Sequence, residues 1–199
     1  MTTANSTTAK VTLSDTTSNP APLGLLGFGM TTILLNLHNA GLFELNSMIM
    51  GMGLFMGGSA QVIAGVQEWK KNNTFGATAF TAYGFFWLSL VATWLLPSAG
   101  LNANASSAVA MGFYLGLWGL FTAGMFVGTL RINKALQVVF GSLTVLFFLL
   151  AAANFTGSHM IHTLAGIEGV LCGLSALYAC IAQILNEVYG EEIMPIGKI

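Results

Sequence analysis

Six long apolar segments, separated by short polar breaks, run through almost the whole chain. They lie near residues 22–42, 45–67, 74–96, 107–129, 136–154 and 160–186. Each is close to the roughly 20 residues that an α-helix needs to cross a bilayer. Only 7% of the residues are charged, against about 25% in an ordinary soluble domain. The sequence therefore predicts an all-α membrane protein with six transmembrane helices.

Both ends of the chain differ from this apolar body. Residues 1–18 are rich in Ser and Thr and offer little to bury, which predicts a mobile N-terminal tail. Residues 19–189 make up the predicted six-helix transmembrane domain, and residues 190–199 a short C-terminal tail. Glycines four residues apart within the spans, such as Gly112 and Gly116, predict close helix packing inside one subunit or between subunits.

The basic residues indicate how the spans are oriented. They fall in the N-terminal tail, the second loop, the fourth loop and the C-terminal tail, as Lys10, Lys70, Lys71, Arg131, Lys134 and Lys198. Six spans put these four regions on one side of the membrane, and excess Lys and Arg mark the cytoplasmic side. We therefore expect a multi-pass protein of the plasma (inner) membrane with both termini in the cytoplasm.

Several classes of function are disfavoured. The net charge is −1 and there is no block of basic residues, so nucleic acid is not an expected partner. The sequence has no metal-ligand cluster, no Gly-rich phosphate loop and no Ser-His-Asp set, and the pair His159 and His162 stands alone. We therefore expect neither an enzyme nor a bound metal or cofactor.

The first span begins within a Pro-rich and Gly-containing stretch, Asn19-Pro20-Ala21-Pro22-Leu23-Gly24-Leu25. A Pro at the first helical position suits a helix start, because its missing N–H would have been unpaired there. The following N–H groups, including those of Leu23 and Gly24, are expected to be free to meet an anion. We predict that Asn19, Pro20, Leu23 and Gly24 contact a substrate. The alternative is a helix cap that binds nothing.

Rows of polar and small side chains recur at helical spacing on four spans and indicate a path through the bundle. These rows are Phe28, Thr32, Asn36 and Asn39; Ser47, Leu54, Gly58, Gln61, Gly65 and Glu68; Thr74, Thr78, Thr81, Phe85 and Ser89; and Leu143, Phe147, Leu150 and Asn154. Lipid-facing surfaces have no need of hydroxyl or amide groups, whereas a passing anion needs donors. We predict substrate contacts at Thr32, Asn36, Gln61, Thr81 and Asn154. Interhelical hydrogen bonds, worth about 0.6 kcal/mol each, are the alternative.

One acidic residue falls deep inside a span. Glu168 lies about eight residues from the outer end of the sixth segment, hence roughly 12 Å deep. An acid at that depth is costly and is a functional candidate by default. We predict either a proton-coupling role for Glu168 or a neutral, hydrogen-bonded side chain that ties helices together.

The stretch from Asn19 to Leu25 resembles the signature of the acetate uptake transporter family, the succinate-acetate permease type. Similar motifs follow along nearly the whole chain: Gly27-Phe28-Gly29-Met30-Thr31-Thr32, Gly57-Gly58 with Gln61, Glu68, Asn73-Thr74-Phe75-Gly76, Thr81-Ala82-Tyr83-Gly84, Leu115-Gly116-Leu117-Trp118-Gly119, Leu136-Gln137 and Leu185-Asn186-Glu187. The resemblance implies a six-helix protomer, a homohexamer and one pathway per protomer.

The resemblance also implies a substrate and a narrowing. Members of this family pass acetate, and some pass succinate, by proton-coupled symport or through a channel-like anion pathway. Their hydrophobic constriction is made by a Phe, a Tyr and a Leu, which correspond to Phe28, Tyr83 and Leu143. The helical rows independently include Phe28 and Leu143. Tyr83 lies on a different side of its helix from Thr81, so its assignment rests on the resemblance alone.

Glu168 departs from the family pattern, in which an apolar or small residue is expected. We therefore hypothesise that Glu168 influences the pH dependence of acetate flux. Two other functions stay open at this stage. One is a pore for small neutral solutes such as urea, ammonia or undissociated acid, and the other is a non-transporting membrane sensor or scaffold.

Overall fold

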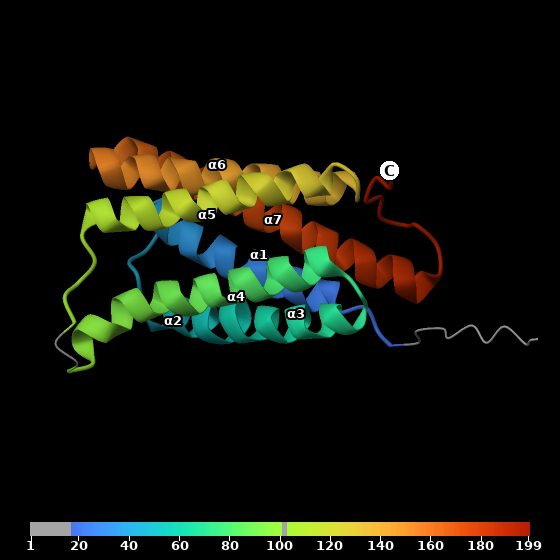
Figure 1. The fold of residues 1–199 in the computed structure, drawn as a ribbon. Helices are drawn as coiled ribbons and strands as arrows, with labels where there is room; N and C mark the ends of the chain where they lie inside the picture. The colour runs from blue at the N-terminus through green and yellow to red at the C-terminus, as the bar shows by residue number, and fades with distance from the viewer. Residues whose placement is uncertain (1–16, 101–102) are drawn as a thin grey trace, which may run out of the picture.

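The computed structural model describes residues 17–100 and 103–199, which form a bundle of long helices (Figure 1). Most of the N-terminal tail predicted for residues 1–18 therefore lies outside the described residues. The elements, in chain order, are α1 (Ala21–Asn39), α2 (Ser47–Met52), the π-helical η1 (Gly53–Ala60), α3 (Gln61–Lys70), α4 (Thr74–Leu95), the 3-10 turn η2 (Leu96–Ser98), α5 (Ala108–Thr129), α6 (Lys134–Thr156) and α7 (His159–Tyr189).

Six helical spans in the described part of the chain are long and apolar enough to cross a membrane. The elements α2, η1 and α3 run on as one span over Ser47–Lys70, and α4 with η2 makes another over Thr74–Ser98. The predicted all-α fold with six transmembrane helices is therefore confirmed. The predicted segments and the observed spans differ by only a few residues at each end, where polar caps rather than hydropathy fix the boundary.

Asn and Ser side chains cap the N-terminal ends of most of the spans. Asn73 accepts a hydrogen bond from the N–H of Gly76 at the start of α4, and Asn133 accepts one from Leu136 at the start of α6. Ser107 and Ser158 do the same for α5 and α7. Each oxygen satisfies one of the N–H groups that the first helical turn leaves unpaired. The polar breaks in the sequence thus contain the residues that cap the following helices.

α1 runs through the middle of the bundle and contacts α7, α3, α4 and η1 (Figure 1). It packs closely against α7, where two glycines meet. A Cβ at Gly29 would lie 2.9 Å from the carbonyl oxygen of Gly173, and a Cβ at Gly173 would lie 2.8 Å from that of Gly29. Such contact between helix backbones is possible only without side chains, as small-residue motifs in membranes predict.

The π-helical segment η1 widens the second span beside this centre. It is rich in glycine, and the ring of Trp87 packs on Gly57, where a Cβ would lie 2.7 Å from the indole. Gln61 follows directly after η1 and is 1% exposed. π-Helical turns inside longer helices occur frequently at functional sites.

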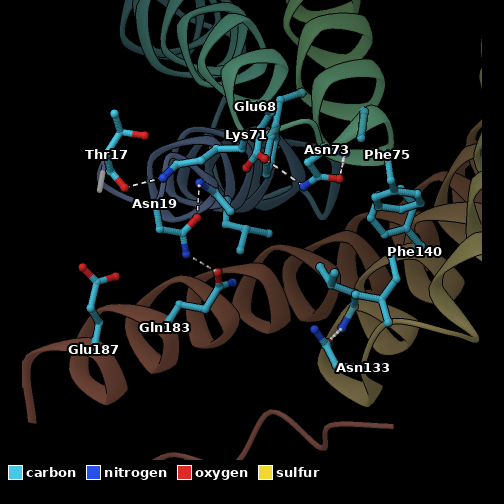
Figure 2. A pocket seen from close by; sticks show the side chains of 17 residues that line it. Thr17, Asn19, Glu68, Lys71, Asn73, Phe75, Asn133, Phe140, Gln183 and Glu187 are labelled. Carbon is cyan, nitrogen blue, oxygen red and sulfur yellow. Dashed lines mark hydrogen bonds between the residues drawn. The ribbon is translucent and has the colours of Figure 1, made fainter. Parts of the chain in front are cut away.

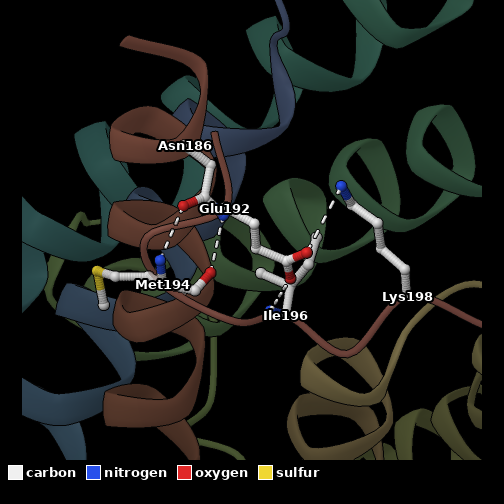
Figure 3. Close-up of polar contacts among 5 residues, drawn as sticks. All are labelled: Asn186, Glu192, Met194, Ile196 and Lys198. Atoms are coloured by element: carbon white, nitrogen blue, oxygen red, sulfur yellow. Dashed lines mark hydrogen bonds and ion pairs between the residues drawn. The ribbon is translucent and has the colours of Figure 1, made fainter. Parts of the chain in front are cut away.

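The chain beyond α7 folds back rather than trailing away (Figure 3). Asn186 donates to the carbonyl oxygen of Met194 (2.8 Å) and accepts from its N–H (2.9 Å). Glu192 accepts from the N–H of Ile196 (3.2 Å) and pairs with Lys198 (3.8 Å). This C-terminal strap, residues 190–199, then reaches the start of α6.

At the start of α6, the carbonyl oxygens of Gly197 and Ile196 accept hydrogen bonds from the N–H groups of Lys134 (2.9 Å) and Ala135 (3.0 Å). The strap therefore pairs N–H groups that the first turn of α6 cannot pair for itself. The C-terminal residues thus serve as part of the cap of α6.

The basic residues of the described chain gather at one end of the bundle, as their spacing predicted. Lys71 donates to the backbone oxygen of Thr17 just before α1, and Asn133 pairs with Lys198 through the backbone. The loop after α3, the loop after α5, the chain before α1 and the C-terminal strap thus meet at this basic end (Figure 1). Lys10 lies outside the described residues.

Candidate functional site

A cavity of about 580 Å³ opens at the basic end and is lined by 17 residues (Figure 2). We call it the vestibule. Its wall combines α1, α3, α4, α6 and α7 with the segments that join them, including Asn19, Glu68, Lys71, Asn133 and Gln183. Lysine and glutamate both contribute, so the vestibule is polar without being strongly charged in one sense.

Several polar side chains in the vestibule are already paired with each other (Figure 2). Asn19 donates to Gln183 (3.1 Å), which joins the start of α1 to α7. Asn73 donates to Glu68 Oε2 (2.8 Å). Glu68 is 2% exposed, and its Oε1 has no partner among the described residues. Glu68 Oε1 is thus a buried acceptor without a partner in the described chain, at the wall of the vestibule.

The start of α1 does not present the free donors that the sequence predicted. The N–H groups of Leu23 (3.1 Å) and Gly24 (3.4 Å) both donate to the carbonyl oxygen of Pro20, and the N–H of Ala21 donates to Asn19 Oδ1 (3.1 Å). The prediction of free N–H groups at Leu23 and Gly24 is wrong, because a tight first turn closes on Pro20. The alternative of a helix cap describes this turn.

The predicted contacts of this stretch also separate in space. Asn19 lines the vestibule, whereas Pro20, Leu23 and Gly24 do not. Leu23 is 40% exposed on the outside of the bundle. Gly24 packs directly against the ring of Phe80 on α4, so its role in this structure is to let α4 approach α1.

Two small cavities continue from the vestibule along the bundle. The near cavity, about 20 Å³, is lined by Leu25, Phe28, Gln61, Ala79, Phe80, Tyr83, Val139, Phe140 and Leu143. The far cavity, about 30 Å³, is lined by Phe28, Thr32, Leu35, Asn36, Tyr83, Phe86, Trp87, Leu143, Leu146, Phe147 and Leu150. The lining residues advance along α1, α4 and α6 from one cavity to the next, so the three cavities form a series.

Three side chains line both small cavities: Phe28, Tyr83 and Leu143. They come from α1, α4 and α6 and are 6%, 3% and 3% exposed. The ring centroids of Phe28 and Tyr83 are 6.3 Å apart. These are the residues predicted as a constriction, and the structure brings them together at the boundary between the near and far cavities.

Tyr83 is held by its hydroxyl group. The oxygen is 2.9 Å from Thr122 Oγ1 on α5, and the Thr122 hydroxyl in turn donates to the carbonyl oxygen of Trp118 (2.7 Å). Its ring contacts Phe140 and Phe121 edge to face. The phenol therefore presents its apolar ring, and not a free hydroxyl group, to the narrow boundary.

The polar residues predicted along the path have different surroundings. Gln61 lines the near cavity and donates to the carbonyl oxygen of Gly57 (2.7 Å). Asn36 lines the far cavity, but it donates to the carbonyl oxygen of Thr32 (2.9 Å) and accepts from Asn39 (3.0 Å). Thr32 Oγ1 is buried at the far cavity without a partner among the described residues.

Thr81 and Asn154 do not line the vestibule or the two small cavities. Thr81 packs against Gly65, and Phe85 in the same row is 56% exposed. The row predicted on α4 thus faces away from the cavities, because the face that carries Tyr83 is the buried one. Asn154 donates to the carbonyl oxygen of Leu150, one turn beyond the far cavity.

Trp87 is a polar lining residue of the far cavity that the sequence analysis missed. It stands one helical turn after Tyr83 and is 2% exposed, and its Nε1 has no partner among the described residues. The spacing of four from Tyr83 was a usable signal, since residues i and i+4 share a helix face.

The side chain of Glu168 extends from α7 towards α6, and Glu168 lines none of the three cavities. Ser142 donates its hydroxyl hydrogen to Glu168 Oε1 at 2.5 Å, and Glu168 Oε2 is buried without a partner among the described residues. Across residues 17–100 and 103–199, no group of three or more His, Cys, Asp and Glu side chains is arranged to hold a metal ion.

Comparison with known proteins gives close matches over most of the chain. It is 57% identical over 181 residues to the succinate-acetate/proton symporter SatP of Escherichia coli K12, covering 91% of this chain and 96% of that protein. The solved structure of the bacterial acetate channel SatP superposes with a TM-score of 0.90 at 57% identity, covering 91% of this chain and 99% of that one.

A more distant relative extends the comparison to yeast. The ammonia transport outward protein 2 of Saccharomyces cerevisiae is 38% identical over 173 residues, which cover 84% of this chain and 61% of the yeast protein. The profile of the GPR1/FUN34/yaaH family matches residues 2–191. Six apolar spans, the matching channel structure and this profile agree, and the chain is a multi-pass membrane protein that belongs to the GPR1/FUN34/yaaH family.

Proposed function

We propose that this protein transports acetate and related small carboxylates, succinate among them, across the membrane, and that it is not an enzyme. The observation that carries the proposal is the series of cavities along α1, α4 and α6, which narrows at Phe28, Tyr83 and Leu143 in a chain 57% identical to a solved acetate channel. The vestibule collects the solute at one end. The three apolar side chains form the constriction through which it passes.

The chemistry of the route suits weak and brief binding. Among the described residues, no Lys or Arg lines either small cavity. Amide, hydroxyl and indole groups at Gln61, Thr32 and Trp87 accompany the apolar walls. Conduction requires sites that are favourable enough to enter and weak enough to leave. A carboxylate therefore passes without a permanent cationic partner.

Flux of labelled acetate into liposomes that contain the purified protein tests this proposal. We expect uptake well above that of empty liposomes, and uptake equal to that of empty liposomes would instead favour a sensor or scaffold. Current recording in lipid bilayers then distinguishes channel-like anion conduction from proton-coupled symport. A channel-like anion pathway gives a current whose reversal potential follows the acetate gradient, whereas symport of one proton with one acetate is electrically silent and acidifies the receiving side.

A pore for neutral solutes is the second candidate, because one relative carries the name of an ammonia transporter. The same liposomes test it by the rate of internal alkalinisation after an ammonium pulse. Rapid alkalinisation together with absent acetate uptake would replace the first proposal by the second.

The orientation and assembly belong to the same proposal. The basic end, with Lys70, Lys71 and Arg131, is expected to face the cytoplasm together with both termini, in the plasma (inner) membrane. For the homohexamer, the supporting feature is α5, whose Phe113, Leu117 and neighbours are exposed and border an apolar groove of about 400 Å³. Native mass spectrometry of the detergent-solubilised protein tests the six-subunit state.

A further inference from the structure

One turn of α5 supports the constriction from behind. Within residues 17–100 and 103–199, no α5 side chain lines the vestibule or either small cavity. Three of them nevertheless contact Tyr83. The ring centroids of Trp118 and Phe121 lie 5.9 and 5.7 Å from that of Tyr83, and Thr122 Oγ1 lies 2.9 Å from its hydroxyl oxygen. α5 therefore contacts the tyrosine of the constriction on the side away from the path.

The direction of the bond between Tyr83 and Thr122 follows from the single hydrogen on each hydroxyl group. Thr122 donates its hydrogen to the carbonyl oxygen of Trp118 (2.7 Å). Its oxygen must then accept from Tyr83, so the tyrosine hydrogen is used inside the protein. Thr122 is fully buried, and successive hydrogen bonds in such a low-dielectric surrounding strengthen one another.

The other neighbours of the Tyr83 ring are aromatic. Phe28 and Phe140 contact it at centroid distances of 6.3 and 6.0 Å. Tilted and edge-to-face ring contacts tolerate a range of angles and distances, whereas a hydrogen bond weakens steeply when it is bent. In the part of the chain that the structure describes, Thr122 is the one hydrogen-bond partner of the Tyr83 hydroxyl group. The angle of the ring in the constriction is therefore fixed by this bond.

We propose that Thr122 is a positioning residue that sets the selectivity of the constriction without lining it. By holding the Tyr83 hydroxyl group against α5, Thr122 keeps the ring opposite Phe28 and Leu143 and keeps the opening narrow. Loss of the bond frees the ring to tilt, and larger carboxylates then pass. The inference rests on the proposed function, since it names a residue that controls which solutes take the same path.

The ratio of lactate flux to acetate flux into liposomes tests the proposal. Thr122→Val keeps the shape of the side chain and removes the hydroxyl group, so the ratio is expected to rise about threefold to tenfold, the weight of one hydrogen bond. Thr122→Ser keeps the hydroxyl group and is expected to restore strict selectivity.

Thr129→Val is the matched control. Thr129 lies on the same helix and is also fully buried, but its hydroxyl group donates to the carbonyl oxygen of Phe126 (2.6 Å) in its own helix. The control is expected to keep the wild-type ratio. A wild-type ratio in Thr122→Val, or an equal rise in Thr129→Val, overturns the proposal.

A double-mutant cycle shows whether Thr122 acts through Tyr83. Tyr83→Phe removes the same bond from the other side and is expected to raise the ratio by a similar factor. Adding Thr122→Val to Tyr83→Phe is then expected to change nothing more, because the bond is already lost. Effects that multiply overturn the proposal. If Thr122→Val does not fold, Tyr83→Phe decides alone, and a wild-type ratio in that variant overturns the proposal.

Thermal unfolding of the same proteins in detergent measures the bond without transport. Non-additive shifts of the unfolding midpoint are expected for Tyr83→Phe and Thr122→Val. Such shifts combined with unchanged flux ratios make the bond purely structural and overturn the proposal. If the wild-type protein moves no acetate, the proposed function itself fails, even where the midpoints show that the two residues are coupled.

Discussion

The hydroxyl group of Ser142 on α6 donates to Glu168 Oε1 on α7 at 2.5 Å, and the next residue, Leu143, lines both small cavities. Cys172, one turn further along α7, contacts the carbonyl oxygen of Val139 through its Sγ (3.7 Å). α7 thus holds α6 at the level where Leu143 and Val139 line the near cavity. Glu168 does not line the three cavities, but it is bonded to α6, which lines them.

Glu168→Gln is expected to flatten the dependence of acetate flux on pH. The amide oxygen of Gln can still accept from Ser142, but the amide has no proton to lose. Ionisation of Glu168, in contrast, places a charge on a carboxylate whose Oε2 has no partner in the described chain. On α7 the titratable neighbour is Cys172, and the facing Ser142 of α6 carries no charge. Flux into liposomes over a pH series measures the effect.

The matched control for this experiment is Glu191→Gln, the same change at an exposed position beyond α7. Its pH profile should follow the wild type. If Glu168→Gln also follows the wild type, Glu168 has no proton-linked role and only ties α6 to α7.

Leu143→Ala is expected to let larger monocarboxylates pass. Removing the side chain joins the near and far cavities, because Leu143 lines both and is 3% exposed. The ratio of lactate flux to acetate flux measures the change, and we expect it to rise several-fold. Leu171→Ala, at a position 61% exposed on α7, serves as the control. Exclusion of lactate as strict as in the wild type would remove Leu143 from the constriction.

Gly173→Ala is expected to destabilise the bundle by about 1–3 kcal/mol, the usual cost of overpacking. The added Cβ would lie 2.7 Å from Ile33 Cγ1 and 2.8 Å from the carbonyl oxygen of Gly29. Gly51→Ala is the matched control, because a Cβ there meets nothing within 4 Å. Thermal unfolding in detergent should show a lower midpoint for Gly173→Ala alone. Equal midpoints would mean that α1 and α7 do not pack this closely.

Truncation after Pro195 is expected to lower the unfolding midpoint, because it removes the carbonyl oxygens that pair with the N–H groups of Lys134 and Ala135. Each lost hydrogen bond contributes about 1 kcal/mol. Lys198→Ala removes only an ion pair whose side chains are 73% and 38% exposed, and such pairs contribute little. A truncated protein that unfolds at the same temperature as Lys198→Ala would show that the strap does not cap α6.

Much of the fold could be predicted from the sequence. The six spans followed from the length of the apolar segments. Because alternate loops lie at the same end of a bundle of spans, the sequence also predicted that one end gathers Lys70, Lys71, Arg131, Lys134 and Lys198. Phe28 and Leu143 were placed on the right faces by helical spacing alone. These features were accessible because a spanning helix must satisfy its own backbone, so the spans follow from local sequence.

The site was less predictable, since it depends on which neighbours each side chain meets. Leu23 and Gly24 were expected to offer free N–H groups, but the carbonyl oxygen of Pro20 accepts both. Thr81 followed the polar row of its helix, whereas the buried face of α4 is the one that carries Tyr83 and Trp87. A row of hydroxyl groups identifies a helix face but not what that face packs against.

The sequence by itself determined the membrane fold, the number of spans and the gathering of the basic loops at one end of the bundle, because these depend on hydropathy and charge along one chain. Only the tertiary structure decided that Phe28, Tyr83 and Leu143 share one boundary, and that Thr32 Oγ1 and Trp87 Nε1, from two residues of the far cavity, have no partner among the described residues. The reason is physical. Whether a buried polar group finds a partner is settled by the packing of helices distant in sequence, and no local pattern encodes it.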